Sequence, residues 1–369
     1  MSIRRRVMAR KLSGNCATAA RTSLLRALHA AALLIASGLM TLPARAELIV
    51  LAAPITGDSY YGEVAREIFD FHVAYAKAIR APDQVLILTD EGAYERYAAV
   101  LGSEKVLVAP MADIWARDFA PSNAEDPVYF RYTAAGQGGG YTGQDDADAV
   151  QIALAELTDA ADMTIRATHL LNDGGNFVDD YAGNAVVSTK FLTDNNLTED
   201  EARAALQRVT GIKHVAFIEA DEQGGLEHAD GVVSFVDTNT LMINSYPEDP
   251  AYARQLRADL ERGLPGVTIH EIVTPYDGSQ IYDERFGSAC WLYTNALVTP
   301  ERIYLPQFGI PEDATALAQV RAATTREVVP VSSSQVCKMG GGVRCMSWQL
   351  RGAAADGLLA YAASEQARR

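Results

Sequence analysis

The chain has 369 residues, of which 47 are acidic and 32 basic, and its net charge is −15. A chain this acidic repels nucleic acid and anionic membrane surfaces and favours small cationic ligands, although the charge could equally serve solubility alone. No Pro/Ser-rich linker, charge block or low-complexity run interrupts the sequence after residue 46, which indicates one large domain.

The first 46 residues are predicted to be a secretory signal peptide. Basic residues come first, an apolar run extends from Ala30 to Met40, and Ala44 and Ala46 supply the small side chains for cleavage after Ala46. The apolar run is shorter than the roughly 20 residues that a membrane-spanning helix needs. Because the removed segment carries eight basic and no acidic residues, the mature chain, residues 47–369, would have a net charge of −23. We therefore expect a periplasmic or secreted protein with no membrane anchor after cleavage.

Helices and strands are predicted to alternate along the mature chain. Thr198 and Glu201 form a capping box that would open one of the helices. Amphipathic patterns predict helices at 63–79, 94–101, 147–160, 199–210, 248–263 and 312–325. Apolar runs predict strands at 84–88, 105–110, 267–273 and 327–331.

Three predicted hairpins share one design. Each has a polar residue at the head of its first strand, then a turn, then a second apolar strand. They begin at Asn176, Asp230 and Asn295, and their second strands are 185–188, 240–243 and 303–306. The design predicts a repeated unit of hairpin, helix and strand.

Polar strand-head residues recur at similar intervals. Asp118, Asn176, Asp230, Asn295 and Cys345 are separated by 58, 54, 65 and 50 positions. A period of this length is typical of repeated supersecondary units. Five such units in a ring would bring these five side chains to one central axis. The alternative is an ordinary α/β protein that happens to contain hairpins.

The last of these residues is a cysteine that follows three glycines. Gly340–Gly342 permit a close approach of the backbone, so the segment predicts a tight turn that presents the thiol of Cys345 to a substrate. A thiol with a histidine and carboxylates elsewhere in the chain is typical of enzymes with a cysteine nucleophile. His228 lies two positions before Asp230, on the same face if this segment is a strand.

These motifs resemble the pentein superfamily of guanidino-group-modifying enzymes, and within it the agmatine deiminase and Porphyromonas-type peptidyl-arginine deiminase family. The resemblance implies a five-bladed α/β propeller of pseudo-fivefold hairpin–helix–strand units, with no metal or organic cofactor. This chain has Glu227 where the family usually has Gly, and Val343-Arg344 where it usually has Ile-His. The matching segments, in the family's order, are Trp115–Pro121, Asp173–Phe177, Glu227–Asp230, Tyr293–Asn295 with Leu305-Pro306, and Gly340–Cys345.

The resemblance implies a guanidine deiminase, a hydrolase that converts agmatine, arginine or the C-terminal arginine of a peptide to the ureido product and ammonia. Asp118 and Asp230 would bind the planar guanidinium through paired, charge-assisted hydrogen bonds. Cys345 would attack its central carbon. His228 would protonate the departing ammonia and then activate water. Asn295 would hold the imidazole or the tetrahedral adduct.

Further residues are predicted to bind substrate or to support the site. The resemblance places Trp115 and Asp173 among them, and Arg117 is expected to orient the site. Arg131 or Arg344 could bind the carboxylate of an arginine substrate. Arg344 could instead favour the thiolate of Cys345, as could the glycine-rich turn and the bound substrate cation, or it could pair with an acid elsewhere in the chain.

The sequence leaves alternative functions and the state of two cysteines undecided. The same residues could support amidino transfer to an amine, a Cys-His-Asn peptidase would leave the paired aspartates unexplained, and a non-catalytic periplasmic guanidino-binding protein would need no nucleophile. With Cys345 assigned as the nucleophile, Cys290 and Cys337 are left as structural cysteines that could form a disulfide in an oxidising compartment.

Overall fold

The computed structural model describes residues 46–134, 140–220 and 226–369. All of them belong to one compact unit, Arg45–Arg369. The predicted signal peptide lies outside the described residues except for Ala46. Within the described ranges, no helix is both long enough and apolar enough to cross a membrane.

Three sheets repeat the predicted order of hairpin, helix and strand. In each, the first strand is antiparallel to the second, and the third returns parallel to the second after a helical crossover. The first of these sheets contains β6 (Val178–Asp179), β7 (Asn184–Ser188) and β8 (His214–Ile218), the second β9 (Val233–Asp237), β10 (Thr240–Asn244) and β11 (Thr268–Ile272), and the third β12 (Leu297–Val298), β13 (Arg302–Gln307) and β14 (Glu327–Ser332). Their crossover helices are α6 (Lys190–Asn195) with α7 (Glu199–Thr210), α8 (Pro250–Gly263) and α9 (Glu312–Ala323).

Two further sheets of the described residues are variants of the same unit. One pairs β4 (Val128–Arg131) in parallel with β5 (Arg166–Leu171) across α5 (Gly140–Ala160), and an isolated antiparallel bridge from Ser122 to Val128 stands in place of the first hairpin strand. The other has the strand order β15-β1-β2-β3. Its elements are β1 (Glu47–Ala52), α2 (Ala65–Ala78), β2 (Gln84–Thr89), α3 (Glu91–Leu101), β3 (Val106–Val108) and β15 (Trp348–Arg351), which leads into α10 (Gly352–Gln366).

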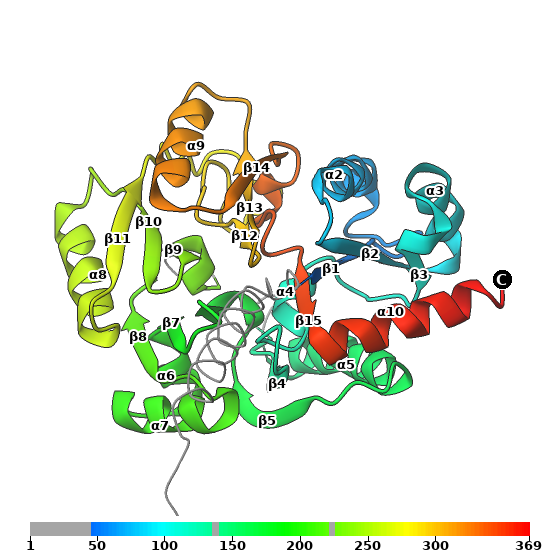
Figure 1. Ribbon diagram of the computed structural model, residues 1–369, viewed down its shortest axis with the longest axis horizontal. Coiled ribbons are helices and arrows are strands. Elements are labelled where there is room, and N and C mark those ends of the chain that lie inside the picture. Colours follow the sequence, from blue (N-terminus) through cyan, green and yellow to red (C-terminus); the bar gives the residue numbers. More distant parts are fainter. Residues whose placement is uncertain (1–45, 135–139, 221–225) are drawn as a thin grey trace, which may run out of the picture. The chain divides into compact units, whose positions relative to one another are not determined.

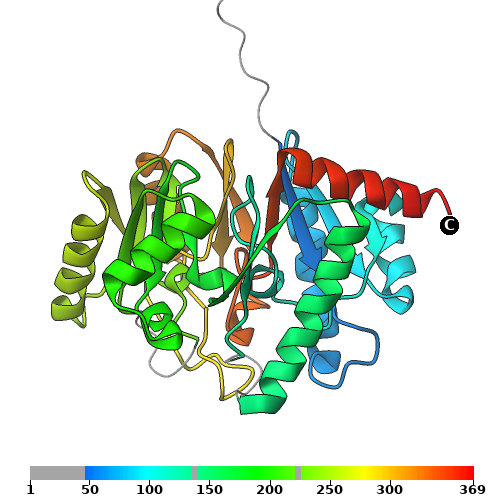
Figure 2. The ribbon, with the colours of Figure 1, turned by 90° about the horizontal axis from the view of Figure 1, so that it is seen from below.

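The pairing of β15 with β1 joins the last motif of the chain to the first strand. The two strands are antiparallel, with Glu47 opposite Arg351 and Val50 opposite Trp348. In Figure 1 the sheets follow one another in chain order around the middle of the described unit, with β15 beside β1. Figures 1 and 2 show helices such as α8 and α9 on the outer side of their sheets. The mixed α/β fold is therefore as predicted.

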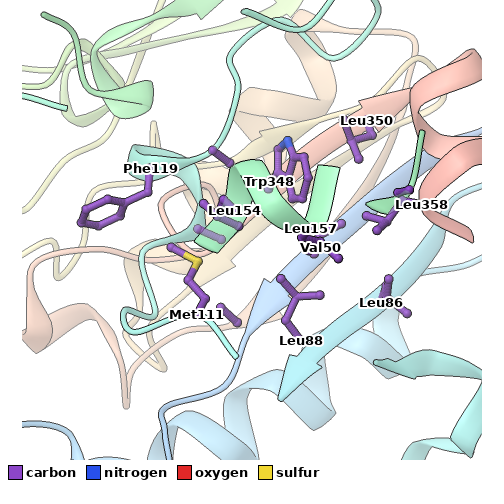
Figure 3. Close-up of a cluster of buried hydrophobic side chains, with 14 of the residues drawn as sticks. Val50, Leu86, Leu88, Met111, Phe119, Leu154, Leu157, Trp348, Leu350 and Leu358 are labelled. Atoms are coloured by element: carbon purple, nitrogen blue, oxygen red, sulfur yellow. The ribbon is translucent and has the colours of Figure 1, made fainter. Parts of the chain in front are cut away.

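A buried apolar cluster stabilises the pairing of β15 with β1. Trp348 and Leu350 of β15 pack in one cluster with Val50 of β1 and with Leu154 and Leu157 of α5 (Figure 3). The indole of Trp348 is almost fully buried. Burial of side chains of this size stabilises a fold by roughly 1.5–3 kcal/mol each, so packing as well as hydrogen bonding holds β15 in place.

Local sequence signals explain several element boundaries. The predicted capping box is present, because the Thr198 side chain accepts from Glu201 and the Glu201 side chain from Thr198. α8 begins with Pro250 at its first position, and the side chain of Asp249 caps it. The prediction missed β1, β4, β5, β8, β15, α4 (Ala116–Phe119), α6 and α10. In β5 no residue is fully buried, so it lacks a strong apolar pattern, and Gly352 and Gly357 weaken the helical signal of α10.

The five strand-head residues stand at equivalent places. Asp118 lies in the short helix α4 (Ala116–Phe119), Asn176 in the turn Gly174–Asn176, and Asp230 in the turn Ala229–Gly231. Asn295 lies two positions before β12, and Cys345 lies three positions before β15. Asp118 precedes the bridge at Ser122 by four positions. Each therefore lies in the segment that leads into the first strand or bridge of its unit.

The disulfide between Cys290 and Cys337 is present. It joins the segment that leads to Asn295 with the segment that leads to Cys345. Next to it, the backbone N–H of Ala289 donates to the carbonyl oxygen of Cys337 at 3.0 Å. The cross-link therefore ties together two neighbouring strand heads.

Removing this cross-link should destabilise the fold. Because it closes a loop of 47 positions, replacing both cysteines by Ala should lower the free energy of unfolding by about 4 kcal/mol. Urea unfolding followed by tryptophan fluorescence would measure the change. Reductant should lower the stability of the parent towards that of the Cys290→Ala/Cys337→Ala variant and leave the variant unchanged. A variant as stable as the oxidised parent would contradict this expectation.

Candidate active site

Four of the five strand-head residues face one cavity. Its volume is about 1340 Å³, far more than a single small molecule fills. Asn176 is the exception and is absent from the cavity wall. The inner end of the wall includes Trp115, Asp118, His228, Asp230, Asn295 and Cys345.

The glycine-rich turn places the thiol of Cys345 at the cavity wall. A Cβ on Gly341 would clash with the ring of Trp115 and with the side chain of Cys345, so only glycine lets these groups meet. The backbone N–H of Arg117 donates to the carbonyl oxygen of Cys345 at 3.1 Å. The cysteine is only 7% exposed, so the turn presents the thiol to the cavity and shields it elsewhere.

The surroundings of the thiol disfavour its ionised form in the empty site. Burial raises the pKa of Cys345 well above its ordinary value, and the carboxylates of Asp230 and Asp118 raise it further. Asn295 opposes this by donating from Nδ2 to Sγ at 3.0 Å. The thiol lies 3.7 Å from Oδ2 of Asp230, to which it donates. A backbone hydrogen bond from Gly342 lowers the pKa of Cys345 and the charge of Arg344 attracts the thiolate, but burial and the two carboxylates outweigh both contributions.

His228 lies between two carboxylates. Its Nε2 is 3.0 Å from Oδ2 of Asp173, and its Nδ1 is 3.6 Å from Oδ1 of Asp118. Burial alone would lower the pKa of His228, but Asp118, Asp173 and Asp230 outweigh burial and raise it to about 10. His228 is therefore an imidazolium at neutral pH.

The two carboxylates beside His228 are held in different ways. Asp173 accepts from the backbone N–H and the hydroxyl of Thr133, at 2.8 and 2.9 Å. Asp118 accepts from the backbone N–H of Gly175 at 3.0 Å. Burial raises the pKa of Asp118 to about 7, although the charge of His228 opposes the rise. A Cβ at Gly175 would lie 2.5 Å from Nδ1 of His228, so this close approach requires glycine.

A model of the Porphyromonas-type peptidyl-arginine deiminase family matches residues 43–350 of this chain. This chain belongs to that family. The family lies within the pentein superfamily, as the motifs predicted.

Individual relatives agree with this membership. The agmatine deiminase of Pseudomonas fluorescens (strain SBW25) is 24% identical over 320 residues, which cover 75% of this chain and 86% of the relative. The solved agmatine deiminase of C. jejuni has a TM-score of 0.68 at 17% identity and covers 84% of this chain and 94% of its own. That of Enterococcus faecalis has a TM-score of 0.67 at 18% identity, with coverage of 84% and 93%. At this identity the structures show a shared fold.

Three arginines that the sequence analysis considered for the site, Arg117, Arg131 and Arg344, lie away from the cavity wall in the structure. Arg131 is exposed and forms an ion pair with Asp148 at 2.8 Å. Arg117 is buried and donates to Oε1 of Gln349 at 2.6 Å. Neither they nor Arg344 line the cavity. Arg131 and Arg344, the two candidates for a substrate carboxylate, are each paired with an aspartate, and for Arg344 this matches the alternative of pairing with an acid elsewhere in the chain. Arg117 contacts Gln349, and its expected role of orienting the site stays a prediction.

Three further assignments change. Asn295 holds the thiol, so the prediction that it holds the imidazole of His228 is wrong for this state. Asp173 supports the imidazole and does not line the cavity, so it is no substrate contact. Asn176 is structural, because its Oδ1 accepts from the backbone N–H of Ser188 at 2.8 Å and of Ala229 at 3.2 Å. It thereby fastens the turn that carries Asp230.

Sequence reasoning missed Thr133 as the anchor of Asp173, because no motif surrounds it. It also missed the outer wall of the cavity, where acidic and aromatic side chains gather from several loops. Their spacing in the sequence is irregular. Described members of this wall are Asp58, Asp113, Asp146, Glu219, Glu248, Asp249, Tyr246, Tyr252 and Tyr276.

The pKa shift of the thiol can be tested without a substrate. We expect alkylation of Cys345 by iodoacetamide to be half-maximal above pH ~8.5, the ordinary thiol value, because burial and the two carboxylates oppose ionisation. Asp118→Asn should lower the midpoint, and Asn295→Ala should raise it, because a donor to the thiolate is lost. Peptide-level mass spectrometry over a pH series would measure the rates. A midpoint at the ordinary value, unchanged in both variants, would contradict this picture.

Proposed function

We propose that this protein is a guanidine deiminase that hydrolyses an amine-terminated guanidino compound such as agmatine to the ureido product and ammonia. The observation that carries the proposal is the meeting of Cys345, the imidazolium of His228 and two carboxylates, Asp118 and Asp230, at the inner end of one cavity. A binding protein would need neither the thiol nor the acid.

The two cavity carboxylates, called the clamp from here on, suit a guanidinium. This cation is planar and presents several N–H donors in a fixed fork. Asp118 and Asp230 both face the cavity, and both raise the pKa of the thiol between them. A guanidinium bound by the clamp would neutralise that effect. Binding would therefore favour the thiolate of Cys345 directly beside the carbon that it must attack.

The bonds and protons then balance as follows. The thiolate of Cys345 adds to the guanidino carbon, and His228 donates its proton to the departing nitrogen, which leaves as ammonia. A thiouronium adduct remains on the sulfur. The neutral imidazole then takes a proton from water, whose oxygen adds to the same carbon. As the C–S bond breaks, the remaining hydroxyl proton passes to solvent, where the released ammonia takes it up as ammonium, and the ureido product, the thiolate and the imidazolium are left.

The outer wall favours an amine over a carboxylate at the other end of the substrate. Among the described lining residues, the cationic side chains are His228 and Arg285. Arg285 is engaged by Asp283 through Nε at 3.0 Å and NH2 at 2.6 Å. The remaining charged side chains of the wall are acidic, and they attract an ammonium group and repel a carboxylate. The P. fluorescens relative is likewise an agmatine deiminase.

The family fold supports a further proposal about architecture. We infer that the five sheets of the described residues are the blades of a pseudo-fivefold α/β propeller, with the strand heads at its axis. The equivalent positions of Asp118, Asp230, Asn295 and Cys345 before their first strands support it.

Turnover tests the proposed function directly. With agmatine, we expect stoichiometric ammonia and ureido product, and a kcat/KM at least about tenfold higher than for arginine or a peptide ending in arginine, because the wall repels their carboxylate. Cys345→Ala should lose several orders of magnitude in kcat, whereas Cys290→Ala/Cys337→Ala should stay active wherever it is folded.

Other products would point to other functions. Consumption of agmatine without ammonia, in the presence of an added amine, would indicate amidino transfer. Binding without any turnover would indicate a guanidino-binding protein. A preference for the peptide would overturn the choice of substrate.

We also propose that residues 1–46 are a signal peptide and that the enzyme acts outside the cytoplasm. The basic and apolar segments of the leader and the disulfide between Cys290 and Cys337 support this, because structural disulfides persist in oxidising compartments. Mass spectrometry of the protein from a periplasmic extract should find Glu47 at the N-terminus. An intact leader on cytoplasmic protein would contradict the proposal.

A further inference from the structure

A resident guanidinium lies directly behind the clamp. NH1 of Arg344 donates to Oδ2 of Asp230 at 2.7 Å, and NH2 donates to the carbonyl oxygen of Phe177 at 2.8 Å. The side chains of Arg344 and Asp230 are only 7% and 2% exposed. Because Arg344 does not line the large cavity, it reaches Asp230 from the side away from the substrate.

The two carboxylate oxygens of Asp230 have different surroundings. Oδ2 accepts from Arg344 and lies 3.7 Å from Sγ of Cys345. Oδ1 takes part in neither contact, so it is the oxygen left for a ligand. An opposite charge at hydrogen-bond distance favours the ionised carboxylate, and a second hydrogen bond from Arg344 to the backbone fixes the direction of its fork.

The other arm of the clamp lacks such a partner. Asp118 accepts one backbone hydrogen bond and is 3.6 Å from His228, and burial raises its pKa to about 7. The two arms thus respond to pH in different ways. Asp118 gains its charge as the pH rises through neutrality, whereas the ion pair with Arg344 keeps a fixed cation beside Asp230.

We propose that Arg344 is a positioning residue that keeps Asp230 ionised and oriented in the empty cavity, so that a substrate guanidinium meets a ready acceptor. The inference rests on the proposed function only in its choice of a guanidinium ligand. Arginine keeps its charge at any physiological pH, so its partner faces a constant cation.

Several other charged groups act on Asp230 and enter any pH argument. Without Arg344, Asp230 would be a buried carboxylate next to the thiol of Cys345, with Arg117 and His228 as the remaining cations nearby. Protonation of Asp230 would then compete with binding of a cation at low pH. The groups that face it are Arg344, Cys345, Arg117, His228 and Asp118.

The test is binding of agmatine to the Cys345→Ala protein by isothermal titration at about pH 6 and about pH 8.5. Adding Arg344→Gln should weaken binding at least about tenfold at the lower pH and less at the higher pH, because a buried carboxylate that has lost its guanidinium partner is protonated more readily as the pH falls. Arg344→Lys keeps the charge and should bind within about threefold of the parent at both pH values.

Two control variants separate this role from a general loss of structure. Arg351→Lys alters another buried arginine, which pairs with Glu47 outside the cavity, and it should leave the pH dependence unchanged. Asp118→Asn should show the opposite trend to Arg344→Gln, with the larger loss at the higher pH, because Asp118 is partly protonated at the lower pH.

The outcomes separate cleanly. No loss in Arg344→Gln, or an equal loss at both pH values, would overturn the inference, since a purely structural role predicts no pH dependence. If agmatine does not bind but methylguanidine does, the proposed substrate is wrong, and the same comparison with methylguanidine tests Arg344. If neither ligand binds, the clamp is absent and the inference falls with it.

Discussion

The cost of burying carboxylates governs this structure. Asp118, Asp173 and Asp230 lie almost completely out of water around one thiol, and an isolated buried carboxylate is strongly unfavourable. His228 compensates two of them, and Arg344 compensates the third. In this arrangement one more cation at the cavity wall would be stabilised by both arms of the clamp. The charged side chains of the cavity wall are mostly acidic, and the proposed guanidinium substrate would compensate part of their charge.

Further buried charged side chains lie behind the site, along strands β1 and β15, and they too are paired with protein partners. Arg117 donates to Gln349, whose Nε2 donates to Oε1 of Glu47 at 2.7 Å, and Glu47 also pairs with Arg351. Burial raises the pKa of Glu47 to about 7, although Arg351 opposes the rise. Buried polar networks of this kind are favourable only when their donors and acceptors find hydrogen-bond partners. Their demand for particular partners therefore helps to specify how the first and last strands pair.

The fold and the main site residues were largely predictable from sequence, because both follow from local signals. A polar strand head, a turn and an apolar strand are visible in a short window, and their repetition indicated which side chains would meet. Asp118, Asp230, Asn295 and Cys345 were identified in this way, whereas His228 was assigned through its place beside Asp230 and the resemblance to the family; all five face the cavity. The repeat also placed Asn176 in the same set, but its side-chain amide binds backbone N–H groups and does not face the cavity.

The partners of the arginines were not predictable. A guanidinium on a long side chain can reach many acids, and which one it meets depends on segments far apart in the chain. Arg344 is 114 positions from Asp230, and Arg117 is 232 positions from Gln349. The raised pKa of Cys345 was not predictable for the same reason, because it comes from burial and from the carboxylates of Asp230 and Asp118, which lie far from Cys345 in the sequence.

The antiparallel pairing of β15 with β1 has a consequence for the order in which activity arises during synthesis. Cys345 follows the other strand-head residues in the chain, so the ribosome adds the nucleophile after the clamp and the imidazole. Until β15 emerges, β1 has no antiparallel partner, and one edge of its sheet stays open to other chains. The same event that covers this edge also delivers the thiol. A growing chain therefore receives the proposed nucleophile together with the strand that closes this sheet, so closure and assembly of the proposed active site coincide.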